Sequence, residues 1–440
     1  MSATSTFDSP NRAASDPWFH AALNRLSGLR WLAAAHLYLF HLRAVHQASR
    51  TAADPPPFSV PLFDLLPSWL DRVCERGYCA TSLFFLLSGF TLAWLYVGVD
   101  GAITVEPWVF WRARATRLFP LHIALLILIA PLVWVFASGL KSTTFFGAPV
   151  ATSTYLAIGF AMSATLTQAW FPEFALSWNF PTWALSNVAF FYAVFPWTVG
   201  RLRRLSSGAK RRLAWMIPLV SLVPSAVYLW IAGEDRQISF DGVQFWKQFG
   251  NEFVMRNPLF WLPHFVLGML LAEFTRRRNP TANVGVANSW KRLFSVGDAS
   301  VVALVWMLAA PESVWTEQLG LPAHWLRLML RHGLMAPLFL AVVADLVAGR
   351  GITAKFFECR WLARLGDASF SLFMWQLPMI ALVPLWNWLG HALVKAARFP
   401  ETTQPASAAV ASFALLLAAT TLVALGSAAV ERRVTRWLRS

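Results

Sequence analysis

An arginine and two histidines lie in one apolar stretch near the start of the chain. Arg30 opens the segment RWLAAAHLYLF, His36 lies inside it, and His41 follows it directly. An ionisable side chain inside a bilayer is costly unless it is paired or faces a wet cavity, so such residues are usually functional. Histidine takes and gives a proton near neutral pH, as a general base must. His41 is therefore a candidate base.

The spacing of these residues separates one pair from the third. At about 100° per residue, eleven positions turn a helix through roughly three full turns, so Arg30 and His41 share a face about 16–17 Å apart along the axis. His36 points to a different face. If Arg30 lies at the cytoplasmic end, His41 lies more than halfway across the bilayer. The alternative is that His41 lies near the outer surface and is simply hydrogen-bonded there, or that the segment is interfacial.

The composition indicates what kind of element must hold these side chains. Of 440 residues, 57% are hydrophobic and 13% are charged. About a quarter of the residues of a soluble protein are charged, so this chain is predicted to be an integral membrane protein. The net charge of +15 is spread over short clusters between apolar segments. Positive loops on the cytoplasmic side explain that spread better than nucleic-acid binding does.

Eleven apolar runs are long enough to cross a bilayer, at about 20 residues each. They lie near 26–46, 79–99, 118–138, 154–171, 182–200, 213–232, 258–274, 296–311, 332–349, 367–388 and 406–430. If the basic connections all face the cytoplasm, one of the three runs between 118 and 200 must not cross. The run at 154–171 is rich in Thr, Ser and Gly, so we interpret it as re-entrant. The expected fold is all-α, with about ten transmembrane helices and both termini inside.

Several stretches resemble the membrane acyltransferase-3 family, the bacterial integral-membrane O-acyltransferases. LSGLRWLAAAHLYLFH resembles the opening helix of that family, whose signature is an arginine and a histidine with ten residues between them. Further stretches follow in the family's order: RGYCATSLFFLLSGFTLAW (76–94), FWRARATRLFPLH (110–122), NFPTWALSNVAFFYAVFP (179–196), RNPLFWLPHFVLGMLL (256–271), LGDASFSLFMWQLP (365–378) and VERRVTRWL (430–438). The resemblance covers nearly the whole chain.

The resemblance implies an activity and a location. The family transfers an acyl group, often acetyl, from cytoplasmic acyl-coenzyme A to a hydroxyl group of a glycan or another small acceptor. Lipopolysaccharide, exopolysaccharide, peptidoglycan and macrolides are among its acceptors. It implies ten transmembrane helices in the bacterial inner membrane, with acyl-CoA as a donor substrate, no permanently bound cofactor, no metal and no nucleic acid. A periplasmic or envelope protein could be a further partner.

The expected domain organisation follows from the same match. A cytoplasmic tail is expected at 1–25, a transmembrane acyltransferase domain at 26–430 and a basic cytoplasmic tail at 431–440. Nothing in the sequence indicates a second, soluble domain.

The resemblance also assigns roles to residues. Acyl transfer needs a base that removes the proton of the attacking hydroxyl. His41 is expected to be that base, or a relay, and Arg30 to orient the site or bind donor phosphate, unless it only sets topology. Arg114 and Arg117, about 60° apart on one helical face, suit the phosphates of coenzyme A. Arg112 is either a third contact or an ordinary topogenic charge.

Four further residues are candidates for supporting the site. Ser88, followed by Gly89, fits a packing notch better than a nucleophile. Ser186 is ambiguous, and Trp183 and Gln376 lie inside matched motifs.

Two positions depart from the family pattern. Val188 stands where the family usually has a glutamate, and Gln376 stands where it commonly has a histidine. Glu75, Glu173 and Asp367 are the acids adjacent to matched motifs. The departures leave open a divergent acceptor, a slower reaction or a catalytically silent accessory subunit. A transporter or flippase is the alternative from another class, because buried Arg and His residues also serve proton-coupled carriers.

Overall fold

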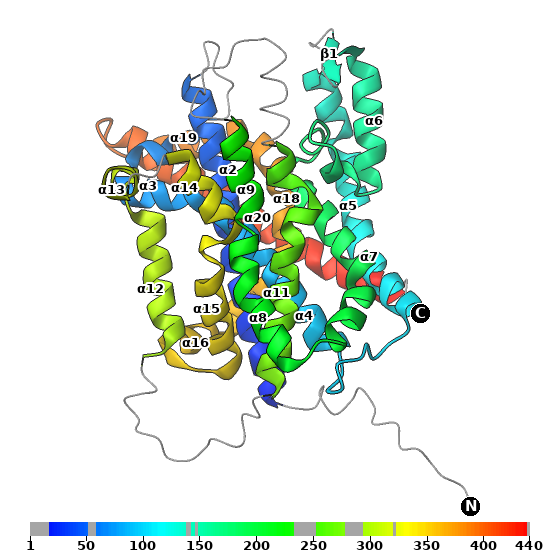
Figure 1. Cartoon of the computed structure of the whole chain (residues 1–440). Coiled ribbons are helices and arrows are strands. Elements are labelled where there is room, and N and C mark those ends of the chain that lie inside the picture. Colours follow the sequence, from blue (N-terminus) through cyan, green and yellow to red (C-terminus); the bar gives the residue numbers. More distant parts are fainter. Residues whose placement is uncertain are drawn as a thin grey trace, which may run out of the picture.

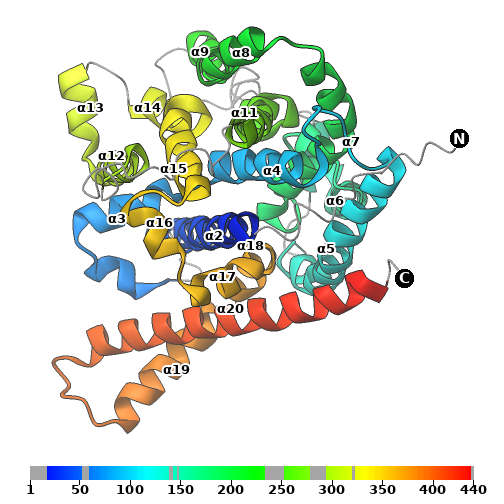
Figure 2. The same ribbon diagram turned by 90° about the horizontal axis from the view of Figure 1, so that it is seen from below.

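The computed structural model describes residues 17–51, 59–137, 142–145, 148–232, 252–277, 294–319 and 323–437. A long helix, α2 (Pro17–Thr51), runs through the middle of the molecule (Figures 1 and 2). Among the described elements six helices contact it: α3 (Ser68–Glu75), α4 (Ala80–Tyr96), α15 (Ala336–Ala348), α16 (Gly351–Phe357), α17 (Arg360–Asp367) and α18 (Ser369–Ala381). The helix that carries Arg30 and His41 is therefore surrounded by other helices.

The remaining elements form an outer layer around this centre. On one side lie α5 (Pro107–Ala137), α6 (Thr152–Ala164), α7 (Trp183–Arg203), α8 (Ser207–Val220), α9 (Val223–Ala232) and α11 (Pro258–Arg277). On the other lie α12 (Val296–Ala309), α13 (Glu312–Leu319), α14 (Ala323–Met329), α19 (Val383–Ala396) and α20 (Gln404–Trp437). Short turns join them: η1 (Pro61–Leu65), η2 (Arg76–Cys79), η3 (Gln168–Trp170), η4 (Phe180–Thr182) and the π-helical η7 (Leu330–Leu334).

The apolar helices identify a membrane protein. Within the described residues, five helical stretches are long and apolar enough to cross a bilayer, or six if α18 and α19 count as one bent span. The central α2 is not one of them, although its 35 residues extend for about 52 Å. Its neighbours, rather than lipid, surround it, so it can carry charges that a lipid-facing helix could not. The count of ten crossings stays a prediction.

The run at 154–171, expected not to cross, forms α6, whose 13 residues span about 20 Å, too short for a hydrocarbon core of about 30 Å. Two other expected elements differ in the structure. The run at 213–232 is divided between α8 and α9, near Pro218. The run at 367–388 is not one straight span, because α18 and α19 meet at a bend of 72°.

The described chain is helical, as expected, except at one short segment. β1 (Ser142–Phe145) pairs antiparallel with β2 (Ala148–Ala151) in a two-stranded hairpin between α5 and α6. Thr and Val favour extended backbone, and the segment lies outside the apolar runs, where no helical periodicity is imposed.

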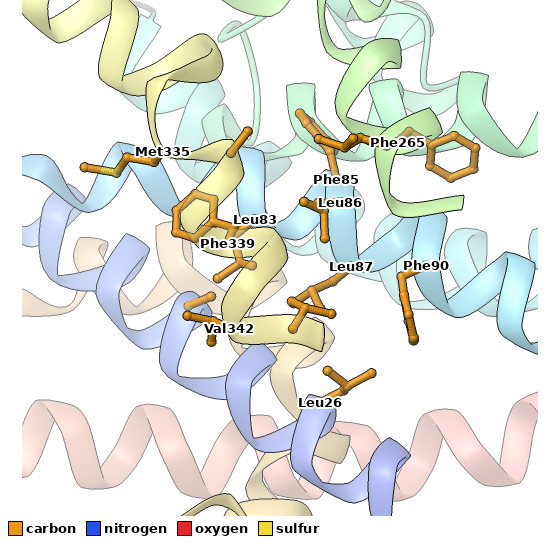
Figure 3. Packing of buried hydrophobic residues seen from close by; sticks show 14 of the residues in the cluster. Leu26, Leu83, Phe85, Leu86, Leu87, Phe90, Phe265, Met335, Phe339 and Val342 are labelled. Carbon is orange, nitrogen blue, oxygen red and sulfur yellow. The ribbon is translucent and has the colours of Figure 1, made fainter. Parts of the chain in front are cut away.

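Close packing between α4 and α11 supports the centre of the molecule. A Cβ atom added to Gly89 would collide with the backbone of Phe265, and one added to Gly268 would collide with the backbone of Leu86. Side chains of α4, among them Leu86 and Phe90, pack into the main hydrophobic core (Figure 3). The packing notch predicted around Gly89 is present, and glycine is what lets the two backbones approach.

Substituting this glycine should destabilise the protein. We expect Gly89→Ala to lower the free energy of unfolding by about 1–3 kcal/mol, because the added methyl group meets backbone that cannot move aside cheaply. Gly200→Ala is the matched control: Gly200 lies within helix α7, where a Cβ atom would meet nothing within 4 Å. Thermal unfolding in detergent checks both, and equal stability of the two variants would contradict the close α4–α11 approach.

Candidate active site

His41 is held by a residue from the far end of the chain. Its Nδ1 lies 2.6 Å from Oε1 of Gln376, which is fully buried on α18. An amide oxygen only accepts, so in this arrangement Nδ1–H donates and the lone pair of Nε2 is left for another proton. The ring of Phe180 packs edge-on against the imidazole at 4.7 Å between centroids. The imidazole is thus fixed in tautomer and orientation.

A cavity of about 340 Å³ opens beside His41. It is lined by parts of several elements, including Tyr78, Thr81, Phe180, Trp183, Ala184, Arg256, Arg331 and Phe373. Most of these side chains are aromatic or apolar, and the polar ones are few. Such a mixture is typical of small-molecule sites, in which a few placed polar groups orient a ligand.

His36 has a structural role, as its different face predicts. Its Nε2–H donates to the carbonyl of Val73 at 2.7 Å and so ties α2 to α3. It does not line the cavity that contains His41.

Arg30 lies on the same face of α2 as His41, eleven residues earlier in the chain. Its guanidinium donates to the hydroxyl of Thr91 on α4. The charges of Arg117 and Asp367 also act on it, the first repulsive and the second attractive. Of the three acids adjacent to matched motifs, Asp367 is therefore the one that the structure brings to Arg30. Glu75 instead lies 3.7 Å from each of two other arginines, Arg43 and Arg327.

The two arginines of the third matched stretch lie on α5. Arg114 donates to the hydroxyl of Tyr96 at 2.7 Å and lies over the rings of Tyr96 and Tyr192. Arg117 is about half exposed and has an ion pair of 3.8 Å with Glu431. Arg112 is exposed. Of these three arginines, Arg117 is the one whose charge acts on Arg30.

The supporting residues separate into two groups. Gln376 and Trp183 belong to the His41 cavity, the first through its hydrogen bond and the second as part of the wall. Ser186 does not: it is fully buried, and its hydroxyl donates to the carbonyl of Leu166 at 2.6 Å. Ser88 follows the apolar core residues of α4 and does not line the cavity either.

Val188 stands where the family usually has a glutamate, and it packs among apolar side chains. It is partly buried and packs against two hydrophobic clusters, one centred on α4 and one containing Leu185 and Met374. The position is therefore filled by apolar contacts rather than by a charged group.

Reasoning from sequence did not select three residues of the cavity wall, Tyr78, Arg256 and Arg331. Arg256 opens the matched stretch 256–271, and Arg331 directly precedes the apolar run at 332–349. An arginine at the edge of an apolar run was the available signal, but the same pattern marks ordinary topogenic charges. In the described residues no group of three or more His, Cys, Asp or Glu side chains could hold a metal ion.

Comparison with known proteins identifies the family. The acyltransferase-3 family model, described as an acyltransferase domain, matches residues 23–428. The chain belongs to the acyltransferase-3 family. It is also similar to acyltransferase MdmB of Streptomyces mycarofaciens, with 26% identity over 306 residues, which cover 66% of this chain and 70% of MdmB. No solved structure matches the chain.

Family membership confirms the resemblance seen in the motifs. This member of the family is a membrane-embedded acyltransferase. The pattern of apolar runs with ionisable residues therefore needs neither a transporter nor a silent subunit as its explanation. The matched region begins before Arg30 and ends after α18, so it includes both His41 and Gln376.

Proposed function

We propose that this protein is an O-acyltransferase that moves an acyl group, most simply acetyl, from cytoplasmic acyl-CoA to a hydroxyl of a cell-envelope or exported glycan. The observation that carries the proposal is the His41–Gln376 pair beside a cavity of about 340 Å³. A fixed imidazole with a free Nε2 at a ligand-sized cavity is what general-base catalysis of acyl transfer requires.

In the proposed reaction His41 removes the proton of the acceptor hydroxyl as its oxygen attacks the thioester carbonyl. The new C–O bond forms and the C–S bond breaks, so the acyl group passes to the acceptor. The sulfur leaves with the electron pair of the broken bond and takes the proton that His41 holds. Gln376 keeps Nδ1–H in place throughout, so that Nε2 is the nitrogen that accepts and returns the proton.

The donor is proposed to enter from the end of α2 that carries Arg30. Arg114 and Arg117 would bind the phosphate groups, because guanidinium forks match phosphate oxygens. The pantetheine arm would then extend along the face shared by Arg30 and His41. With both termini in the cytoplasm, as proposed from the basic loops, this direction leads from the cytoplasmic side to the middle of the inner membrane.

A second cavity, of about 200 Å³, also carries arginines. Arg276 donates to backbone carbonyls at the end of α4, and Arg203 lies 3.4 Å from Asp100. Arg114 and Arg117 have partners as well, so the preference for them as phosphate contacts rests on their place in the matched stretch 110–122.

Acetyl-CoA turnover in lipid tests the proposal directly. Purified protein in vesicles should consume acetyl-CoA labelled in the acetyl group and release free CoA, and the label should appear on added envelope glycans. The same glycans from cells with and without this chain should differ by ester groups. Movement of glycan across the vesicle membrane without consumption of acetyl-CoA would show a carrier instead and refute the proposal.

The phosphate role of the two arginines can be measured separately. We expect Arg114→Ala together with Arg117→Ala to raise the KM for acetyl-CoA by about 10- to 100-fold, the cost of losing charge-assisted hydrogen bonds. Arg112→Ala, which removes one charge from the same turn, should change it less than threefold, as expected for a topogenic charge. An unchanged KM in the double variant would remove the proposed donor site from α5.

A further inference from the structure

The wall of the His41 cavity carries a positive charge with no acidic counterpart. Arg331 lies in η7, a π-helical turn, and π-helical turns are frequent at functional sites. Its guanidinium carbon lies 4.7 Å from the ring centroid of Tyr78, and a guanidinium nitrogen contacts Sδ of Met255. No carboxylate of the described residues forms an ion pair with it.

The other charged groups of this wall do not compensate Arg331. Arg256 also lines the cavity, and its charge is paired with Glu252 on the same helix. His41 is engaged by Gln376, an amide without charge. The charge of Arg331 acts on both His41 and Arg256. Among the described residues, the side of the cavity that faces His41 therefore has an excess of positive charge.

The residues behind Arg331 supply no negative charge either. His264 and His332 are fully buried against Trp261, with ring centroids 5.5 Å and 4.4 Å away. None of their ring nitrogens has a hydrogen-bond partner in the described part of the chain. Arg331 is partly buried, and a guanidinium held there without a counterion costs free energy that a bound anion would return.

We propose that Arg331 binds an anionic group, a carboxylate or a phosphate, on the acceptor whose hydroxyl is acylated. This inference rests on the proposed function, because it places the acceptor in the His41 cavity. The planar guanidinium can bind two oxygens of such a group at once. The ring of Tyr78 holds it in position from one side, and Trp183 offers an aromatic face for a sugar. The substrate class is then an acidic or phosphorylated glycan rather than a neutral one.

Three small sugars test the proposal on the full chain in lipid nanodiscs: glucose, glucuronate and glucose 6-phosphate. Binding is measured by the shift in melting temperature with ligand concentration, and transfer by release of CoA from acetyl-CoA. We expect at least one of the anionic sugars to bind about 10- to 100-fold more tightly than glucose. This ratio corresponds to the free energy of one charge-assisted hydrogen bond. A preference for glucuronate indicates a sugar carboxylate, and a preference for glucose 6-phosphate indicates a phosphate group, as in a lipid-linked sugar.

Variants assign the preference to Arg331. Arg331→Gln should remove it, and Arg331→Lys should retain part of it and shows that the position tolerates substitution. Arg327→Gln is the matched control, because Arg327 lies one turn earlier and is already paired with Glu312 at 2.8 Å. Equal binding of all three sugars, or a preference that survives in Arg331→Gln, would overturn the proposal. A loss of turnover that is equal for glucose and the anionic sugars would also overturn it, since that pattern assigns Arg331 to the reacting oxygen.

Failure of the proposed function would look different. The melting-temperature measurement needs no turnover, so it can be repeated in His41→Ala. If no acetyl transfer occurs in any variant while the anion preference persists there and disappears in Arg331→Gln, the anion site stands and the acyl-transfer proposal falls.

Discussion

His41→Ala is expected to lower kcat for acetyl transfer by about 10²- to 10⁴-fold, the contribution typical of a positioned general base. Among the described residues that line the cavity, the imidazole is the side chain whose chemistry suits a base, because the other ionisable side chains there are arginines and a tyrosine. Removing it leaves the cavity and the donor arginines in place. The KM for acetyl-CoA should therefore change little, and initial rates at saturating donor check both constants.

His36→Gln is the matched control for this loss. His36 lies on the same helix and donates to the carbonyl of Val73, a bond that a glutamine amide can also provide. Its turnover should stay within about twofold of the unsubstituted protein. If both variants lose activity together with the same drop in melting temperature, the effect at His41 is structural and the assignment of the base is wrong.

Gln376→Leu is expected to lower kcat by about 10- to 100-fold with the donor KM nearly unchanged. Leucine is similar in size, but it cannot accept the proton of Nδ1, so the imidazole is free to rotate and to exchange tautomers. Loss of a partner that orients a functional histidine costs a factor of this size in other sites. Gln376 is thus a positioning residue, and steady-state kinetics with the donor varied separate this role from a loss of binding.

Gln376→His is the rescue variant, because it restores the residue that the family commonly has at this position. A histidine there can also accept from Nδ1–H of His41. We expect it to retain most of the activity that Gln376→Leu loses. Equal loss in both variants would mean that packing at this buried position, rather than the hydrogen bond, sets the rate.

Gln376 differs from the histidine that the family commonly has at this position. In the sequence this difference counts against a catalytic role, because an amide cannot carry a proton at neutral pH. In the structure the position needs only an acceptor for Nδ1–H, which an amide oxygen supplies at 2.6 Å. Val188 has a comparable explanation, since its surroundings are apolar and a valine packs there without an unpaired charge.

The sequence by itself determined the membrane character, the family and the shared face of Arg30 and His41. These depend on composition, on the order of short motifs and on helical periodicity, all of which are local properties. It could also separate His36 from His41, because a five-residue step changes the face of a helix.

Only the tertiary structure decided which residues surround His41. Gln376 is 335 positions away in the chain, and Arg331 approaches through a π-helical turn that no periodicity predicts. The bend between α18 and α19 was likewise outside the reach of an apolar-run count, because it depends on packing against neighbours. Helix α2 could be predicted from its own residues. The partners of His41 could not, because they are brought to it by the packing of residues far away in the chain.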